Sequence, residues 1–151
     1  MPVLWDVKSG KRLGVLSSKD KGHLAEVVSL AFSGDGKYVA TGDLQGTIVL
    51  WNMKDRTPVR RFKAHAGKVG SLVFIPGRAE FVSSGDDGAV RLWMVARSLV
   101  TNLKEAGPGV TAMTVSSNGS VLYAASDDGA VRGWNVSLRS VRGTIRFEDR
   151  Q

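Results

Sequence analysis

Two histidines and two pairs of aspartates are the residues of this sequence whose types could support acid–base catalysis or metal binding. His23 and His65 are its only histidines, and the carboxylate pairs are Asp86–Asp87 and Asp127–Asp128. The chain has no cysteine, which excludes disulfides, thiolate metal ligands and cysteine nucleophiles. It also lacks an EF-hand spacing, a phosphate-binding glycine loop and a Gly-x-Ser-x-Gly motif. The histidines and aspartates could therefore form a reactive site, or they could stabilise the fold.

Their positions relative to tryptophan favour structure. His65 precedes Trp93 by 28 residues, Ser83 precedes it by ten and Asp87 by six. A histidine ring between a hydroxyl and a carboxylate can bond to both, while the indole N–H donates to the hydroxyl. We therefore expect a clamp that joins distant strands, and no catalytic residue, metal or cofactor.

The tryptophans also show that this unit is repeated. Trp51, Trp93 and Trp134 are separated by 42 and 41 residues, and Trp5 precedes Trp51 by 46. A period near 40 residues is typical of β-propeller blades. Apolar runs separated by turn dipeptides predict four antiparallel strands in each unit. The run 27–32 has apolar residues on both faces of the expected strand, which predicts that neighbouring sheets cover both faces.

The unit before the central one keeps only part of the clamp. His23, Thr41 and Trp51 have the expected spacing, but Gln45 stands where the aspartate should be. A histidine without its carboxylate would be held less firmly. We expect either a weaker clamp in this unit or one in which Asp43 supplies the carboxylate.

The last unit departs further from the pattern. Asp128 and Trp134 are in place, but Ala106 and Ala124 replace the histidine and the hydroxyl residue. We interpret this unit as a degenerate repeat.

These spacings, with the Asp-Asp-Gly turn before Ala-Val-Arg-Leu-Trp, resemble the WD40-repeat family of β-propellers. The resemblance implies an all-β fold over residues 1–151, a partial propeller of three complete four-stranded blades and an incomplete N-terminal half-blade. We place the half-blade at 1–16, the blades at 23–63 and 65–104, and the degenerate blade at 106–147. An open arc leaves apolar ends exposed, so we expect further blades or self-association to close the ring.

The resemblance also implies a non-catalytic scaffold that binds other proteins within a multi-subunit complex. A ubiquitin-ligase substrate receptor is an alternative that fits the same fold. In the family, partners lie across loops ahead of the inner strand and turns between the second and third strands. Carried onto this sequence, the possible protein-binding face consists of Leu24, Glu26, Leu44, Ala66, Lys68, Asp86, Gly107, Gly109 and Asp127.

Charge suggests a further partner. The formal net charge is +7, and the densest basic stretch contains Lys54, Arg56, Arg60, Arg61 and Lys63. These cations could protect an exposed sheet edge from unwanted pairing, or they could contact RNA phosphates. The loop before His23, the segment SGDGKYVATGD and the positive charge also resemble WD-repeat components of ribonucleoproteins, which implies a role in processing ribosomal RNA as an alternative function. No run approaches the roughly 18 apolar residues of a membrane helix, and the N-terminus has no signal-peptide pattern. We expect an intracellular protein, nuclear or cytoplasmic, without a membrane partner.

Overall fold

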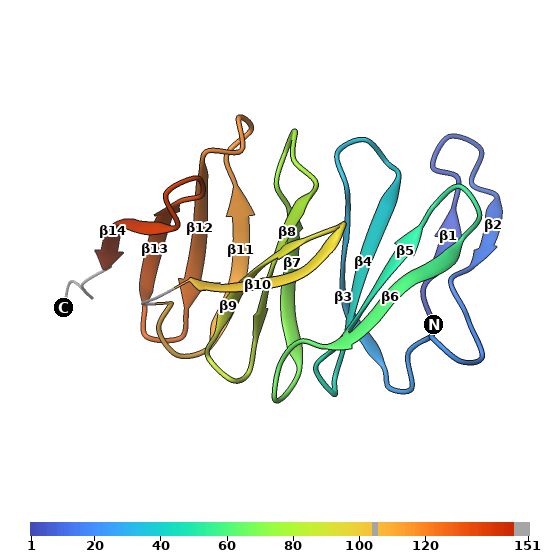
Figure 1. Cartoon of the computed structure of the whole chain (residues 1–151), viewed down its shortest axis with the longest axis horizontal. Helices are drawn as coiled ribbons and strands as arrows, with labels where there is room; N and C mark the ends of the chain where they lie inside the picture. Colours follow the sequence, from blue (N-terminus) through green and yellow to red (C-terminus); the bar gives the residue numbers. More distant parts are fainter. Residues whose placement is uncertain (104–105, 147–151) are drawn as a thin grey trace.

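The computed structural model describes residues 1–103 and 106–146, which form four antiparallel sheets (Figure 1). The half-blade consists of β1 (Val3–Trp5) and β2 (Arg12–Val15). The first complete blade contains β3 (Val27–Phe32), β4 (Tyr38–Asp43), β5 (Thr47–Asn52) and β6 (Thr57–Lys63). The second contains β7 (Val69–Phe74), β8 (Glu80–Gly85), β9 (Val90–Met94) and β10 (Arg97–Leu103). The third contains β11 (Val110–Val115), β12 (Val121–Ser126), β13 (Ala130–Asn135) and β14 (Ser140–Arg146).

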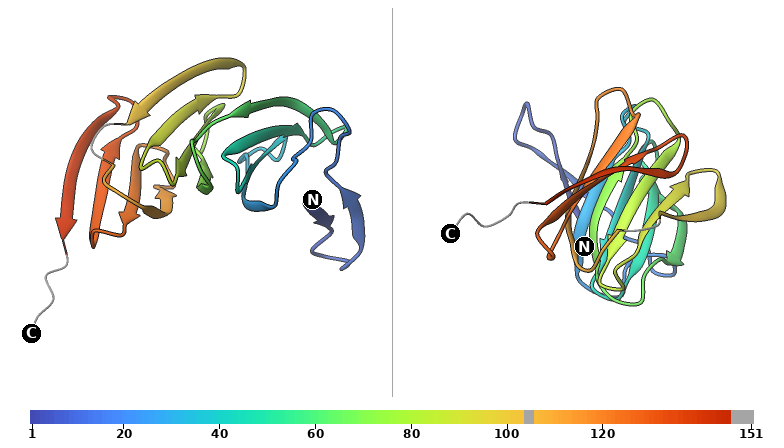
Figure 2. Two further views of the ribbon diagram at one scale, coloured as in Figure 1. Left: turned by 90° about the horizontal axis from the view of Figure 1, so that it is seen from below. Right: turned by 90° about the vertical axis from the view of Figure 1, so that its left-hand side faces the viewer.

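Each complete blade is a meander in which every strand pairs with the next one along the chain. Figure 2 shows the sheets following one another along an open arc, with the two termini at opposite ends. This arrangement confirms the predicted all-β partial propeller of three four-stranded blades and a half-blade. Residues 104 and 147, with which we closed two of the blades, lie outside the described residues. No helix in the described part of the chain has the length and apolar character needed to span a membrane.

The core lies between the sheets, in one layer for each pair of neighbours. Leu4 and Leu16 of the half-blade pack against Trp51 of the first complete blade. Between the first and second complete blades, Phe62 lies against Trp93 with ring centroids 4.6 Å apart. A third layer, which includes the fully buried Trp134, joins the second and third blades. Stacking of sheets thus buries the apolar side chains, which fixes the relative positions of the loops at the blade ends.

The prediction that strand 27–32 is covered on both faces is wrong for one face. Along β3, Val28, Leu30 and Phe32 are 37%, 55% and 51% exposed, whereas the alternating residues are half-buried. The exposed residues lie on one side because successive side chains of a strand point to opposite faces. The preceding sheet contains only β1 and β2, so two strands cannot cover the face that four would cover.

Candidate functional site

The second complete blade contains the full set of residues that we expected to form a clamp. Nδ1 of His65 lies 2.8 Å from Oδ1 of Asp87, and Nε2 lies 2.7 Å from Oγ of Ser83. The indole N–H of Trp93 donates to the same Oγ at 2.8 Å. An ionised carboxylate only accepts, so the bond to Asp87 places the proton on Nδ1, and Nε2 accepts from the hydroxyl. Nη1 of Arg91 lies 2.6 Å from the same Nδ1 and donates to Oδ2 of Asp87 at 2.7 Å. The bonds join the loop before β7 to β8, β9 and the turn between them.

Burial keeps this histidine neutral. The His65 side chain is fully buried, and this burial lowers the pKa of the ring below its usual value. The hydrogen bond and the charge of Asp87 raise the pKa of His65, whereas the charge of Arg91 lowers it further. Burial would raise the pKa of Asp87, but hydrogen bonds from His65 and Arg91 outweigh it and hold the pKa well below its usual range. The ring is thus a fixed neutral link between a carboxylate and a hydroxyl.

In the first complete blade the carboxylate comes from the end of a strand. Nδ1 of His23 lies 2.7 Å from Oδ2 of Asp43, and Nε2 lies 2.7 Å from Oγ1 of Thr41. Trp51 donates to Oγ1 of Thr41 at 2.8 Å. The His23 and Asp43 side chains are only 2% and 1% exposed, whereas Gln45 is exposed. Of the two alternatives left by the sequence, the structure contains the one in which Asp43 replaces the missing aspartate.

Glycine explains why the second blade does not use the same position. Asp43 lies eight residues before Trp51, and the equivalent residue before Trp93 is Gly85. A Cβ at Gly85 would lie 2.7 Å from Cβ of His65, inside van der Waals contact. The ring of His65 therefore occupies space that only glycine leaves free, and its carboxylate must come from the turn instead.

The third blade has an arginine where the histidine is missing. Arg132 donates from Nη1 to Oδ1 of Asp128 at 3.0 Å and from Nη2 to Oδ2. The arginine is buried, and a Cβ at Gly107 would lie 2.6 Å from its Nη1. Sequence reasoning missed Arg132 and its counterpart Arg91, which pairs with Asp87 at 2.7 Å. The available signal was an arginine four residues after each of these aspartates.

The arginine pair of the third blade predicts a specific acid sensitivity. The Arg132 hydrogen bonds lower the pKa of Asp128 to about 2, from an ordinary value of 3.8. A depressed pKa stabilises the folded chain fully above the unfolded value, and the effect is lost as pH falls through the folded value. Urea midpoints of the unmodified chain should therefore fall between about pH 4 and pH 2. In Asp128→Asn this decrease should be smaller, whereas Asp127→Asn should keep the original slope. Equal slopes in both variants would contradict this assignment.

Each histidine is held within its own blade. His23 and His65 belong to different blades, and both ring nitrogens of each are within hydrogen-bond distance of side chains of their own blade. Within the described residues, no group of three or more histidine, aspartate or glutamate side chains could hold a metal ion. What the clamps can do is hold the loops at one end of each blade in place.

The nine residues that we predicted to face a partner lie on those loops, and we call their surface the loop face. One backbone hydrogen bond of 3.0 Å joins the two loops in every complete blade, from Leu44 to Glu26, from Asp86 to Lys68 and from Asp127 to Gly109. Leu24 and Leu44 are 79% and 45% exposed, although both are large and apolar. The structure thus brings six of the nine residues together in three equivalent pairs, and the two exposed leucines belong to the first blade.

Hydrogen bonds join the loop face of the first complete blade to that of the second, and the loops of the second and third blades lie close together. The carbonyl of Gly46 accepts hydrogen bonds from the backbone N–H groups of Ala64, at 2.8 Å, and His65, at 3.1 Å. A Cβ at Gly88 would lie 3.7 Å from the carbonyl oxygen of Gly107. The loops therefore form one continuous surface along the arc.

The basic stretch is less free than its sequence suggests. Nη1 of Arg56 donates to the carbonyl of Leu13, and Nζ of Lys63 donates to the carbonyl of Gln45. Arg60 lies over the ring of Phe62 at 4.6 Å and donates to the carbonyl of Met94 at 3.3 Å. Arg60 is half-buried, whereas the other four cations, Lys54 and Arg61 included, are exposed. Three of the five predicted phosphate contacts thus have partners within the chain.

Comparison with known proteins agrees with this geometry. The family described as "WD domain, G-beta repeat" matches residues 10–52, 56–94 and 97–135. Target of rapamycin complex subunit wat1 of Schizosaccharomyces pombe is 28% identical over 135 residues, covering 88% of this chain and 42% of that protein. The U3 snoRNP-associated protein-like EMB2271 of Arabidopsis thaliana is 35% identical over 104 residues, covering 59% of this chain and 22% of that protein.

A solved structure has the same arrangement of strands. The structure of U3-55K superposes with a TM-score of 0.80 and 29% identity, covering 95% of this chain and 47% of that one. The chain thus spans less than half the length of each of these relatives. Its repeats, its clamps and its blades agree with one family, and the chain belongs to the WD40-repeat family of β-propellers.

Proposed function

We propose that this chain is a non-catalytic binding platform in an intracellular multi-subunit assembly, and that its loop face contacts a partner protein. The observation that carries this proposal is the continuity of the loop face, whose loops are hydrogen-bonded within each blade and between the first two, and lie close together between the second and third. Rigid strands that hold exposed loops are a common basis for recognition. The naming of one relative as a complex subunit supports the same function. Further blades or a second copy would complete the ring around this platform.

A second candidate is a ribonucleoprotein component that touches RNA through its basic stretch. The likeness to U3-55K and to a U3 snoRNP-associated protein favours this function, as does the net charge of +7. The intramolecular partners of Arg56, Arg60 and Lys63 weigh against a broad phosphate-binding surface. Exposed Arg61 is the residue on which this candidate depends most.

Affinity capture should distinguish the two functions. We expect the purified chain to retain specific proteins from a cell extract, also after nuclease treatment. The double variant Leu24→Ser, Leu44→Ser should reduce their recovery by about tenfold, because central apolar contacts supply most of the binding energy of an interface. Leu138 is 74% exposed away from the loop face, so Leu138→Ser serves as the matched control and should change nothing.

Two results would redirect the proposal. Undiminished recovery with the double variant would exclude the loop face. Recovery that disappears after nuclease treatment and in Arg61→Ala, with a steep decrease as salt rises, would favour the RNA candidate instead.

A further inference from the structure

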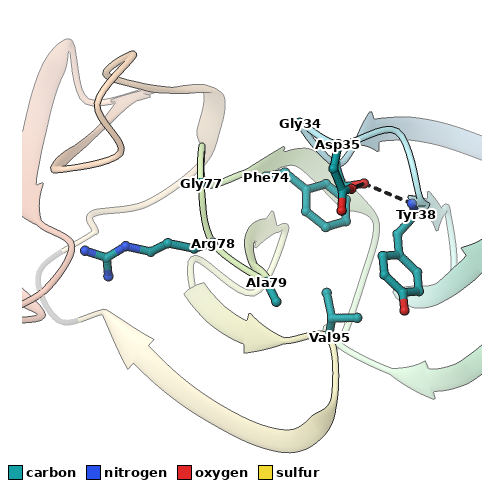
Figure 3. A pocket seen from close by; sticks show the side chains of 9 residues that line it. Gly34, Asp35, Tyr38, Phe74, Gly77, Arg78, Ala79 and Val95 are labelled. Atoms are coloured by element: carbon teal, nitrogen blue, oxygen red, sulfur yellow. Dashed lines mark hydrogen bonds between the residues drawn. The ribbon is translucent and has the colours of Figure 1, made fainter.

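A hollow of about 270 Å³ opens between the first two complete blades, at the end opposite the loop face. We call it the turn cleft. Its walls are the turn between β3 and β4 and the turn between β7 and β8, and Tyr38, Phe74 and Val95 lie between them (Figure 3). This volume is many times the roughly 10–15 Å³ that one water molecule requires. The turn cleft therefore has room for one large side chain.

At the equivalent place between the second and third blades, the two turns lie closer together. There the turn of the third blade packs directly on the second, since a Cβ at Gly119 would lie 2.7 Å from the carbonyl oxygen of Pro76. In the turn cleft, by contrast, a Cβ at Gly34 or Gly77 would meet no atom within 4 Å. The first blade has Ser33–Gly34 where the second has the bulkier Ile75–Pro76. The opening is thus a property of this sequence rather than of the repeat.

The inside of the turn cleft is apolar, and packing and a hydrogen bond hold its walls in place. Phe74 is 6% exposed and packs on Phe81 with ring centroids 5.2 Å apart. Tyr38 is half-buried, and its backbone N–H donates to Oγ of Ser33 at 2.9 Å, which fixes the turn above it. Such a preformed apolar floor favours an aliphatic or aromatic side chain as ligand.

Lysines border the turn cleft on the far side of Tyr38. A second hollow there is lined by Lys37, Met53 and Lys54 among others. The carboxylate of Asp35, which lies between the two hollows, already accepts from the Ser33 hydroxyl at 2.8 Å and from the Lys37 backbone at 3.1 Å. The Lys37 side chain is 74% exposed, and its Nζ lies 3.3 Å from Oδ2 of Asp35, whose side chain is 51% exposed. Lys54 is exposed as well, so this edge carries two accessible ammonium groups and one accessible carboxylate.

Arg78 does not compete for the same ligand. Although its backbone lines the turn cleft, Figure 3 shows its side chain directed away from the cleft. Its Nη2 donates to Oγ of Ser137 at 2.7 Å, and its Nη1 lies 3.6 Å from Oε2 of Glu80. The accessible charge near the cleft is therefore that of the two lysines and of Asp35, which together leave a net charge of +1.

We propose that the turn cleft binds a short acidic peptide segment of another protein, which inserts one large apolar side chain between the turns and places carboxylates beside Lys37 and Lys54. The apolar floor supplies affinity, and the lysines select the charge and direction of the segment. This site lies at the opposite end of the blades from the loop face, and its existence does not depend on the proposed function.

Fluorescence anisotropy with synthetic probes tests this inference. The probe is a labelled seven-residue peptide that carries one phenylalanine followed by three glutamates in a Gly/Ser background. We expect it to bind the unmodified chain at least about tenfold more tightly than the same peptide with alanine in place of phenylalanine. Its affinity should also exceed that of a peptide with lysines in place of the glutamates. In the double variant Lys37→Glu, Lys54→Glu the lysine peptide should bind more tightly than the glutamate peptide.

Two matched glycines provide the structural control. Gly34 and Gly143 both have open space around the position of a Cβ, and neither has a positive φ. Gly34→Leu should fill the turn cleft and weaken the probe by about tenfold, whereas Gly143→Leu, on the outer strand β14, should leave binding unchanged. Ala79→Leu, in the opposite wall, repeats the test should Gly34→Leu unfold.

Several results would overturn the inference. One is that the probe binds no more tightly than the peptide with lysines. Another is that its affinity is unchanged in both Gly34→Leu and Ala79→Leu. Stronger competition by a single-stranded RNA than by unlabelled peptide would show that phosphate, rather than peptide carboxylate, is the preferred anion.

Discussion

Replacing Gly46 with alanine should lower the free energy of unfolding by more than about 3 kcal/mol, because two separate penalties meet at this residue. Gly46 has a φ of +80°, which an L side chain adopts only at a cost of roughly 1–2 kcal/mol. A Cβ would also overlap the carbonyl oxygens of His65 and Gly67, and it would lie 2.8 Å from the carbonyl carbon of His65. Backbone atoms cannot rotate away, so the first and second complete blades must separate there.

Gly36 provides the control that isolates strain from overlap. Its φ is +69°, but a Cβ there would meet nothing within 4 Å. Gly36→Ala should therefore cost only about 1 kcal/mol. Urea unfolding followed by tryptophan fluorescence measures both variants. Equal losses would mean that the blades adjust to a methyl group at Gly46, and that the contact between their loops is not rigid.

The repeat architecture could be predicted because its signals are local. Each blade is a short meander, and its turns and tryptophans recur in the chain at the period of the structure. The clamp of the second blade could be anticipated for the same reason. His65, Ser83, Asp87 and Trp93 are all present, and their chemistry allows one mutually satisfying arrangement.

Other features depend on the distance between blades, which no single repeat encodes. The exposure of Leu30 and Phe32 follows from what the neighbouring sheet lacks, although the strand itself has the composition of a covered one. The turn cleft arises because two turns of different bulk face each other across an interface. The backbone carbonyls that accept from Arg56 and Arg60 lie 43 and 34 residues away in sequence, so the sequence did not indicate these hydrogen bonds.

The clamp of the first complete blade lies between these cases, and it gives the second large effect. Asp43→Ala should lower the free energy of unfolding by about 3–5 kcal/mol, since each buried donor left without an acceptor costs about 1–3 kcal/mol. Three donors depend on this carboxylate. They are Nδ1 of His23 at 2.7 Å, the backbone N–H of Gln45 at 3.0 Å and that of Thr47 at 2.8 Å. Urea unfolding is again the measurement.

Gln45→Asp discriminates between the two positions for the carboxylate. If the residue six places before tryptophan were the one that matters, restoring aspartate there would strengthen the clamp. The structure predicts a change within about 0.5 kcal/mol, because Gln45 is exposed and Asp43 already occupies the partner position beside His23. The opposite results would be that the free energy of unfolding rises by more than about 1 kcal/mol in Gln45→Asp, or that Gln45→Asp fully restores the stability lost in Asp43→Ala. Either result would mean that His23 can donate to a carboxylate at either position. No rescue would mean that the end of β4 alone determines where this blade anchors its histidine.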